Sequence, residues 1–269
     1  DYHAKQKRNS WFDANEKGTI LGQKITPLKR VGVYVPGGKA AYPSSVLMNV
    51  IPAKVAGVEQ IIMCTPPDHE GKVYPTTLVA ANEAGVDVIY KAGGAQAIAA
   101  MAYGTESVPK VYKIFGPGNQ YVTAAKQLVS LRDVAIDMPA GPSEVEVIAD
   151  ESANPAFIAA DFLSQAEHGV DSQAMLVTAS ESIVEPIMQA IREQLDRLPR
   201  KEITEKSLSH SRLIVLKDKQ EVIDFTNLYA PEHLIIQTTD YADIAGLVEN
   251  AGSVFMGPYT PESAGDYAS

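Results

Sequence analysis

Short apolar segments alternate with longer segments of helical spacing along most of this chain. The apolar segments are near-continuous, which is typical of parallel strands buried on both faces. Gly, Pro and Asn residues punctuate the boundaries. The predicted strands are 31–35, 60–64, 86–90, 111–115, 134–138, 145–149, 173–178, 212–216, 233–237 and 253–256. The predicted helices are about 44–56, 74–84, 95–103, 120–131, 155–168, 182–195, 219–229 and 241–250.

This alternation predicts an α/β protein whose mostly parallel sheets carry helices on both faces. A chain of 269 residues is comfortable for two domains, and the loop at 140–142 is a candidate crossing between them. Ligands of such sheets bind beyond the carboxyl ends of the strands. We therefore expect binding residues in the Gly-, Pro- and polar-rich loops 36–45, 92–96, 116–120, 139–144 and 229–233.

Composition narrows the class of partner. The net charge is -10 and no long basic run is present, which argues against nucleic acid or an anionic membrane surface. No apolar segment is long enough to span a bilayer. Cys64 is the single cysteine, so no internal disulfide can form, and a cytoplasmic protein is expected. The chain starts at Asp1 and stops soon after Asp266, which we interpret as a fragment of a longer protein.

Gln165 and His168 form the first candidate site. Residues three apart on a helix share a face, so these side chains can aim an amide oxygen and an imidazole nitrogen at one point. Such a pair suits Zn²⁺, or Mn²⁺ with additional oxygen ligands. The alternative is a structural histidine that the dipole favours at a helix C-terminus. Both interpretations stay open on sequence alone.

Glu232 and His233, after Pro231, form the second candidate site. Histidine is the usual proton acceptor near neutral pH, and a neighbouring carboxylate suits acid–base chemistry. A solvated surface pair is the alternative. Asp266, beside a glycine, is a further group that could bind a metal or move a proton. Ser143 lacks the spacing of a Ser-His-Asp triad, so we expect it to form hydrogen bonds and not to act as a nucleophile.

Two further motifs have mainly structural interpretations. Gly116-Pro117-Gly118-Asn119 begins like a dinucleotide fingerprint, but Tyr121 replaces its last glycine. A turn in which Asn119 caps the next helix is favoured, although the helix amides could hold a phosphate. Cys64 lies inside an apolar strand and is expected to be an inert core thiol, which argues against thiol-based aldehyde oxidation.

Taken together, these residues resemble the histidinol dehydrogenase family. The resemblance covers essentially the whole chain, and its stretches occur jointly and in order, which makes it specific. They are Tyr34–Gly38, Gly93–Ala99, Phe115–Asn119, Asp137–Glu144, Ser164–Gly169, Tyr229–Leu234 and Gly252–Phe255.

The resemblance implies a homodimer of subunits with two incomplete Rossmann-like, doubly wound domains. One domain would combine residues 1–33 with 145–269 and carry the metal and acid–base residues. The other, residues 34–144, would carry the loops that contact NAD. The family also has N-terminal and C-terminal segments that are absent from these 269 residues. The C-terminal segment of the partner subunit supplies a further histidine ligand in the family.

The site residues carry over by the same resemblance. One Zn²⁺ per site would be held by Gln165, His168 and Asp266. Glu232 and His233 would be the acid–base pair. Substrate contacts would come from Ser143, Gln165, His168 and Asp266, and NAD⁺ contacts from Tyr34, Gln96 and Asn119.

The implied reaction converts L-histidinol to L-histidine through an aldehyde, with reduction of two NAD⁺, in histidine biosynthesis. Two rival functions remain. One is a zinc hydrolase that uses the same metal and the same Glu–His pair. The other is a catalytically incomplete fragment that at most binds zinc or a small ligand.

Overall fold

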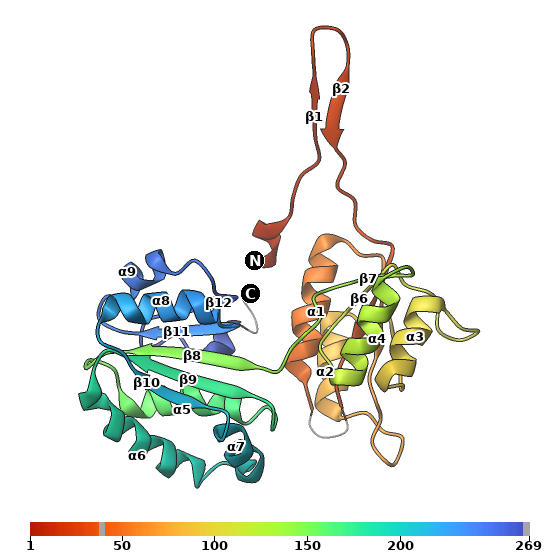
Figure 1. Ribbon diagram of the computed structural model, residues 1–269. Helices are drawn as coiled ribbons and strands as arrows, with labels where there is room; N and C mark the ends of the chain where they lie inside the picture. The colour runs from red at the N-terminus through yellow and green to blue at the C-terminus, as the bar shows by residue number, and fades with distance from the viewer. Residues whose placement is uncertain (38–40, 266–269) are drawn as a thin grey trace. The chain divides into compact units, whose positions relative to one another are not determined.

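The computed structural model describes residues 1–37 and 41–265, and these fall into two compact units. Unit 1 contains residues 1–140 and unit 2 contains residues 141–265. Each unit holds a five-stranded sheet in which every neighbouring pair of strands is parallel (Figure 1). The expected α/β fold with parallel sheets is confirmed.

The sheet of unit 1 has the strand order β5-β4-β3-β6-β7. The chain starts in the middle of the sheet, moves to one edge, returns to the middle and then moves to the other edge, which is Rossmann-like winding. The strands are β3 (Arg30–Tyr34), β4 (Gln60–Cys64), β5 (Val88–Tyr90), β6 (Lys113–Phe115) and β7 (Ala135–Ile136). The helices are α1 (Pro43–Ala56), α2 (Pro75–Ala84), α3 (Gly94–Tyr103) and α4 (Gln120–Ser130).

Alternate residues of these strands face two separate cores. Val31 and Val33 of β3 pack with Val46 of α1, in the same cluster as residues of α2. Tyr34 and Ile62 point to the opposite face, into a cluster with residues of α3 and α4. Because both faces are covered, both sets of strand residues must be apolar, which explains the near-continuous apolar pattern.

The sheet of unit 2 repeats this winding with the order β10-β9-β8-β11-β12. Helices α5 and α6 belong to the core on one face, and α8 and α9 to the core on the other. The strands are β8 (Glu144–Ala149), β9 (Gln173–Thr178), β10 (Arg212–Val215), β11 (His233–Gln237) and β12 (Ser253–Met256). The helices are α5 (Pro155–Ala166), α6 (Val184–Leu195), α7 (Lys201–Leu208), α8 (Lys219–Tyr229) and α9 (Tyr241–Leu247), with 3-10 turns η2 (Glu181–Ile183) and η3 (Glu262–Ala264).

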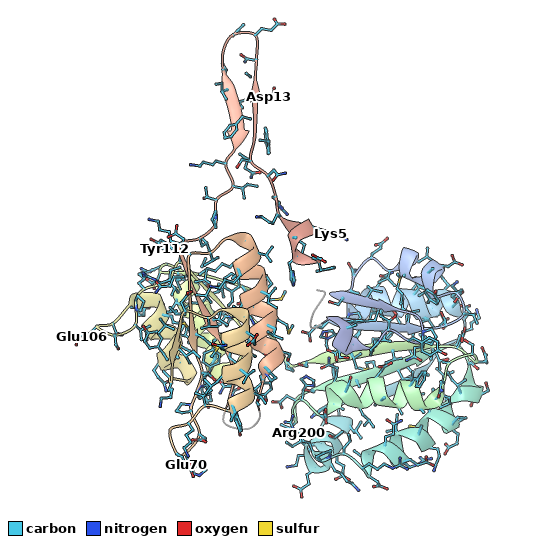
Figure 2. All side chains as sticks on the ribbon, turned by 180° about the vertical axis from the view of Figure 1, so that it is seen from behind. Lys5, Asp13, Glu70, Glu106, Tyr112 and Arg200 are labelled. Carbon is cyan, nitrogen blue, oxygen red and sulfur yellow. The ribbon has the colours of Figure 1, made fainter. Side chains whose placement is uncertain are left out.

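A hairpin near the N-terminus was not predicted by the apolar pattern. Its antiparallel strands are β1 (Trp11–Ala14) and β2 (Ile20–Gln23), and they follow the 3-10 turn η1 (His3–Gln6). All the strand residues are exposed, so no buried face marks them in the sequence (Figure 2). The turn is closed by Asn15, whose side-chain oxygen accepts from the backbone amides of Lys17 and Thr19.

The compact units differ from the expected division of the chain, which joined residues 1–33 to 145–269. Strand β3 begins at Arg30 and pairs with β4 and β6, so residues 30–33 belong to the first sheet. The physical reason is that β3 is the central strand of unit 1 and its valines fill that core. Among the described helices, none is both long enough and apolar enough to cross a membrane.

Glu146 is a fully buried carboxyl group in the core of unit 2. It lies on β8, and its Oε1 lies 2.5 Å from the hydroxyl oxygen of Thr226 on α8. The Thr226 hydroxyl also lies 2.9 Å from the carbonyl oxygen of Val222. One hydroxyl has one proton, which it can donate to Glu146 or to that carbonyl, so both contacts are hydrogen bonds at the same time only when Glu146 is protonated. Burial raises the pKa of Glu146 to about 7, consistent with this arrangement.

We therefore expect wild type to lose stability as the pH rises and Glu146 ionises, and we expect Glu146→Gln to abolish this loss. A carboxyl whose pKa is raised by folding stabilises the protein at low pH, and this contribution is lost as the pH rises from about 4.5 to about 7. The variant should gain up to about 3 kcal/mol relative to wild type between pH 5 and pH 8. Urea unfolding at both pH values measures this, with exposed Glu249→Gln as the control. An equal change in both variants would contradict a neutral Glu146.

Candidate active site

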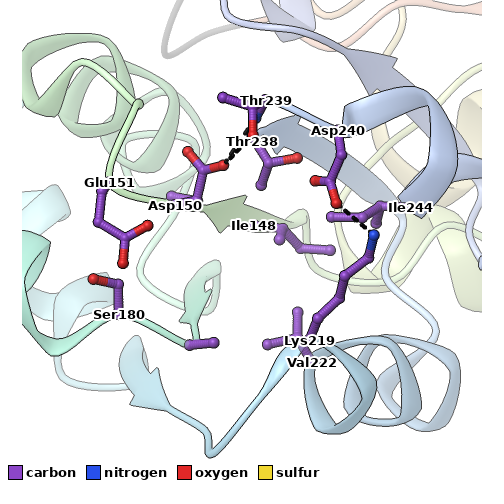
Figure 3. A pocket seen from close by; sticks show the side chains of 12 residues that line it. Ile148, Asp150, Glu151, Ser180, Lys219, Val222, Thr238, Thr239, Asp240 and Ile244 are labelled. Atoms are coloured by element: carbon purple, nitrogen blue, oxygen red, sulfur yellow. Dashed lines mark hydrogen bonds and ion pairs between the residues drawn. The ribbon is translucent and has the colours of Figure 1, made fainter.

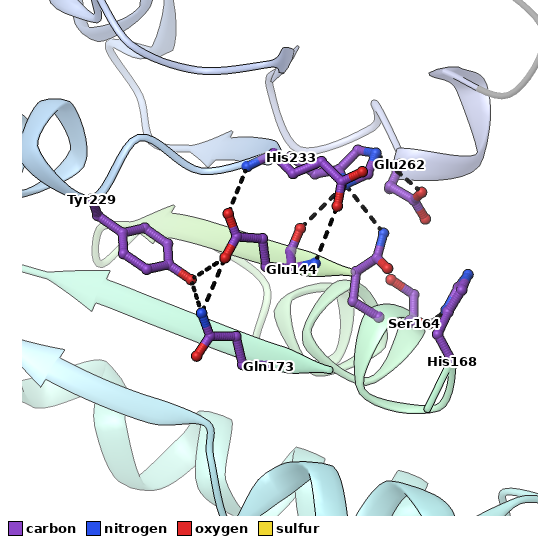
Figure 4. A network of polar contacts seen from close by, with 9 residues as sticks. Glu144, Ser164, His168, Gln173, Tyr229, His233 and Glu262 are labelled. Carbon is purple, nitrogen blue, oxygen red and sulfur yellow. Dashed lines mark hydrogen bonds and ion pairs between the residues drawn. The ribbon is translucent and has the colours of Figure 1, made fainter. Parts of the chain in front are cut away.

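Polar side chains gather at the amino ends of the strands of unit 2, together with the C-terminal end of α5 (Figure 4). Strands β8 and β11 are neighbours in the sheet, and Val145 pairs with His233. Glu144 precedes that pair on one strand and Glu232 precedes it on the other. Residues 88 positions apart in sequence therefore meet at one edge.

Gln165 contributes a buried amide to this edge. Its side chain is 1% exposed, and its Nε2 lies 3.4 Å from Nδ1 of His233. Its Oε1 has no hydrogen-bond partner among the described residues. A buried oxygen without a donor costs free energy unless a ligand or ion satisfies it. This orphan oxygen fits a metal ligand better than a structural amide.

His168 lies just beyond the end of α5 and is exposed. Its Nδ1 lies 2.8 Å from the carbonyl oxygen of Ser164, which can only accept a hydrogen bond. The proton therefore sits on Nδ1 and Nε2 keeps its lone pair. A backbone carbonyl that fixes the histidine tautomer in this way is a common feature of zinc sites.

The third expected metal ligand, Asp266, lies outside the described residues. Within residues 1–37 and 41–265, no three His, Cys, Asp or Glu side chains gather closely enough to hold a metal ion by themselves. Of the expected ligands, Gln165 and His168 are therefore the two that can be assessed. Both offer donor atoms of the type that zinc accepts.

Among the described residues, three acceptors and one donor surround the ring of His233, and the donor, Gln165 Nε2, lies 3.4 Å from Nδ1, farther than the nearest acceptor. Its Nδ1 lies 3.2 Å from the carbonyl oxygen of Glu144 and 3.7 Å from Oε2 of Glu232. The carbonyl requires a proton on Nδ1, so in the neutral ring Nε2 is the basic nitrogen. Glu262 Oε1 lies 3.8 Å from Nε2, where it would stabilise the ring after proton uptake. The ring also stacks on Phe255, with centroids 6.2 Å apart.

Glu232 has an exposed side chain on a backbone that is held in place by Glu144. Its side chain is 51% exposed, and its Oε2 accepts from the backbone amide of Glu144 at 3.3 Å. The preceding Ala230 is a non-glycine residue with φ 55, a conformation that costs about 1–2 kcal/mol. The sharp turn from α8 into β11 is therefore held under strain, and it presents Glu232 to solvent at the site.

Sequence reasoning assigned no individual role to Glu144, Gln173, Tyr229 or Glu262, although all four belong to this edge (Figure 4). The carboxylate of Glu144 accepts from Gln173 Nε2 at 3.0 Å and from the Tyr229 hydroxyl at 3.1 Å. Burial, followed by the nearby charge of Glu144, raises the pKa of Tyr229. The available sequence signal for Glu144 was its position directly before the strand predicted at 145–149. Ser143 lies at the same edge, where its carbonyl oxygen accepts from the amide of Gln173.

The location of this cluster corrects one expectation. Ligands were expected at the carboxyl ends of the strands, but the 229–233 loop precedes β11 and the cluster lies at the amino ends. The carboxyl ends of unit 2 border a cavity of about 190 Å³ instead (Figure 3). Its three carboxylates are already engaged, Asp150 by Thr239, Glu151 by Ser180 and Asp240 by Lys219. None of the expected site residues lines this cavity.

In unit 1 the expected cofactor residues do lie at the carboxyl ends of the strands. Tyr34 ends β3, and its hydroxyl accepts from the amide of Gly94 at the start of α3 at 3.0 Å. Gln96 is exposed in the first turn of α3, where no described side chain caps the helix. Asn119 caps α4 and accepts from Tyr121 N and Val122 N, both at 3.1 Å. The capping interpretation is confirmed, and these two amides are occupied by Asn119.

A buried ion pair fixes the loop that follows β6. Lys126 of α4 is 2% exposed, donates to the carbonyl oxygen of Gly116 at 2.8 Å and pairs with Asp137. Asp137 in turn accepts from the amide of Gly116 at 2.7 Å. Gly116 has φ +107, and a Cβ there would lie 2.0 Å from the carbonyl oxygen of Tyr34. Glycine at this position therefore allows the loop to pass directly over the end of β3.

Lys126→Met should destabilise unit 1 by about 2–3 kcal/mol, because it leaves Asp137 and the Gly116 carbonyl without their buried partner. Lys72→Met, which breaks an exposed pair with Glu70, is the matched control and should cost less than about 1 kcal/mol. Urea unfolding measures both. Equal stability of the two variants would show that the buried pair does not hold this loop.

Comparison with known proteins gives a consistent result. A family model described as histidinol dehydrogenase matches residues 1–269. The histidinol dehydrogenase of Bacteroides fragilis is 63% identical over 268 residues, covering 100% of this chain and 63% of its own length. That of Heliobacterium mobile is 57% identical over 267 residues, covering 99% of this chain and 62% of its own length.

Solved structures agree with this result. The crystal structure of histidinol dehydrogenase from Elizabethkingia anophelis has 52% sequence identity and a TM-score of 0.94, covering 99% of this chain and 62% of its own chain. A putative aldehyde dehydrogenase from Anabaena variabilis, at 15% identity, 97% coverage of this chain, 69% of its own chain and a TM-score of 0.59, shares the fold alone. The chain thus spans about 63% of the length of the curated relatives it matches. With the whole chain matched and more than half its residues identical in these relatives, the protein belongs to the histidinol dehydrogenase family.

Proposed function

We propose that this chain carries the chemistry that oxidises L-histidinol to L-histidine through an aldehyde, reducing two NAD⁺, in histidine biosynthesis. One observation supports this most strongly. In a chain matched to the family over its whole length, His233 lies within 4 Å of Glu144, Gln165, Glu232 and Glu262 at one sheet edge.

The proposed metal ligands are Gln165, His168 and Asp266, and the proposed NAD⁺ contacts are Tyr34, Gln96 and Asn119. Zinc held by these ligands would supply orientation and polarisation of the histidinol substrate, and NAD⁺ held by these contacts would supply the hydride acceptor. The unsatisfied Gln165 Oε1 and the carbonyl-fixed ring of His168 support the metal assignment. Ser143 is proposed to contact the substrate through a hydrogen bond.

His233 would act as the general base in both oxidations. In the neutral ring its Nε2 is free of a proton, because Nδ1 donates to the carbonyl oxygen of Glu144. The alcohol loses its hydroxyl proton to Nε2 as hydride leaves carbon, which gives the aldehyde. The ring is then positively charged beside Glu262 and Glu232, and both carboxylates stabilise that charge.

Glu232 would activate water for the second half of the reaction. Its exposed carboxylate can take a proton from a water molecule that adds to the aldehyde carbon. The protonated His233 ring would return its proton to the aldehyde oxygen in the same step, which gives the neutral hydrate and leaves Nε2 free to accept again. Hydride loss from the hydrate, with its hydroxyl proton passing to His233, then gives the acid. Cys64 cannot offer a thiolate alternative, because it is fully buried and burial raises its pKa to about 12.

We further propose that the enzyme is a cytoplasmic homodimer with no nucleic-acid or membrane partner. A net charge of -10 supports the exclusion of nucleic acid. The resemblance assigns a further histidine ligand to the partner subunit, in a region beyond these 269 residues. Activity is therefore expected to need that region.

The test is NADH absorbance on addition of histidinol and NAD⁺, together with the zinc content of the purified protein. It should be run on this chain and on a version extended to the length of its relatives. The extended enzyme should form two NADH per histidinol consumed. Zinc binding without NADH formation in both versions would favour the catalytically incomplete fragment. Hydrolytic activity without NADH formation would favour the zinc hydrolase.

A further inference from the structure

Glu144 contacts both of the proposed acid–base residues through its own backbone. Its carbonyl oxygen accepts from Nδ1 of His233 at 3.2 Å. Its amide donates to Oε2 of Glu232 at 3.3 Å. The protonation of the ring and the direction of the carboxylate therefore both depend on where the backbone of Glu144 lies at the start of β8.

The side chain of Glu144 fixes that backbone from the other direction. Oε1 accepts from the backbone amide of Glu232 at 3.2 Å, and Oε2 accepts from Gln173 Nε2 and the Tyr229 hydroxyl. Gln173 also donates to the Tyr229 oxygen at 2.7 Å, which closes a triangle of hydrogen bonds. Three donors from β9, α8 and the start of β11 thus converge on one carboxylate (Figure 4).

The two oxygens of the Glu144 carboxylate have enough lone pairs to accept from all three donors in charge-assisted hydrogen bonds. Such charge-assisted hydrogen bonds are roughly twice as strong as neutral ones. The two-way contact with Glu232, amide to carboxylate in both directions, clamps the amino ends of β8 and β11 together. The strained turn at Ala230 enters β11 at this clamp.

We propose that Glu144 is a positioning residue for the histidinol reaction, because its carboxylate clamps the start of β11 and thereby sets the His233 tautomer and the Glu232 orientation. This inference rests on the proposed function and deepens it. Glu144 acts through His233 and Glu232 and takes no proton from the substrate itself.

The kinetic test compares Glu144→Ala, Glu144→Gln and Tyr229→Phe in the extended enzyme. Glu144→Ala should lower kcat about 100-fold with KM for histidinol changed less than about threefold, because displacement of a catalytic group by about 1 Å has effects of this size. Glu144→Gln should recover about tenfold of that loss, since its oxygen can still accept from Glu232 N while Tyr229 reverses its hydroxyl. Tyr229→Phe removes one of the three donors and should cost less than about fivefold.

A second readout does not depend on activity. The chain has five histidines, so ring ¹⁵N signals of the selectively labelled chain can be resolved, with His233→Asn to assign the site signal. In wild type the His233 ring should carry its proton on Nδ1. In Glu144→Ala the two tautomers should exchange, whereas Glu151→Ala, beyond the opposite end of β8, should leave the signal unchanged.

The outcomes separate the two claims. An unaltered His233 tautomer in Glu144→Ala, or a kcat within threefold of wild type, overturns the positioning role. A wild-type enzyme that forms no NADH from histidinol overturns the proposed function, and the ring signals still decide whether Glu144 orients His233. If Glu144→Ala fails to fold, Glu144→Gln decides: wild-type tautomer populations and kcat in that variant overturn the proposal, and partial loss of both supports it.

Discussion

Replacing His233 with asparagine should lower NADH formation from histidinol about a thousandfold in the extended enzyme, the range in which loss of a positioned general base falls. Asparagine can place its amide nitrogen near the position of Nδ1, so donation to the carbonyl oxygen of Glu144 can persist. It has no atom equivalent to Nε2. The expected defect is therefore loss of the proton acceptor in both oxidations, with little change in the fold.

The measurement is single-turnover NADH formation started from the alcohol and, separately, from the aldehyde. Both reactions should slow by a similar factor, because the same nitrogen accepts the proton each time. His210→Asn is the matched control, since His210 is an exposed loop residue outside the cluster. More than a tenth of wild-type activity in the His233 variant would exclude His233 as the base.

Glu232→Gln should slow oxidation of the aldehyde much more than oxidation of the alcohol. Glutamine can still accept from the backbone amide of Glu144 through its oxygen, but it cannot take a proton from water. We expect oxidation of the aldehyde to slow about 100-fold and oxidation of the alcohol less than about tenfold. The aldehyde should then accumulate at the site and be detectable by an added aldehyde trap.

Glu249→Gln, an exposed glutamate in the loop between α9 and β12, controls for loss of charge. The decisive comparison is the ratio of the two rates in each variant. If Glu232→Gln converts the aldehyde to histidine at the wild-type rate, Glu232 does not activate water, and the hydrate step must be assigned elsewhere.

The strands and most helices were predictable because burial on both faces leaves a local mark in the sequence. Helix α7 was missed for the opposite reason. Its buried residues Thr204 and Ser207 are polar, and Ser207 Oγ is satisfied by the carbonyl oxygen of Ser172. No apolar stripe therefore identifies it. The N-terminal hairpin was missed because every residue of its strands is exposed.

Several residues of the site could be predicted from the sequence, but the edge of the sheet at which they lie could not. Gln165, Glu232 and His233 were recognisable from their neighbours in sequence, yet the rule for carboxyl ends placed Glu232 and His233 at the wrong edge of unit 2. The role of Glu144 could not be predicted from its position before a strand, because its partners depend on β8 and β11 being adjacent, which is a property of strand order. In unit 1 the residues proposed to contact NAD⁺ do lie at the carboxyl ends, since Tyr34 ends β3 and Asn119 follows β6.

Diffraction data collected at the zinc absorption edge from crystals of the extended enzyme test the central claim most directly. The account predicts one anomalous peak per site at about 2.0–2.2 Å from Gln165 Oε1 and His168 Nε2, with Asp266 as a further ligand. A zinc peak bound elsewhere, with Gln165 Oε1 still unpaired and His168 turned away from the His233 ring, would contradict it.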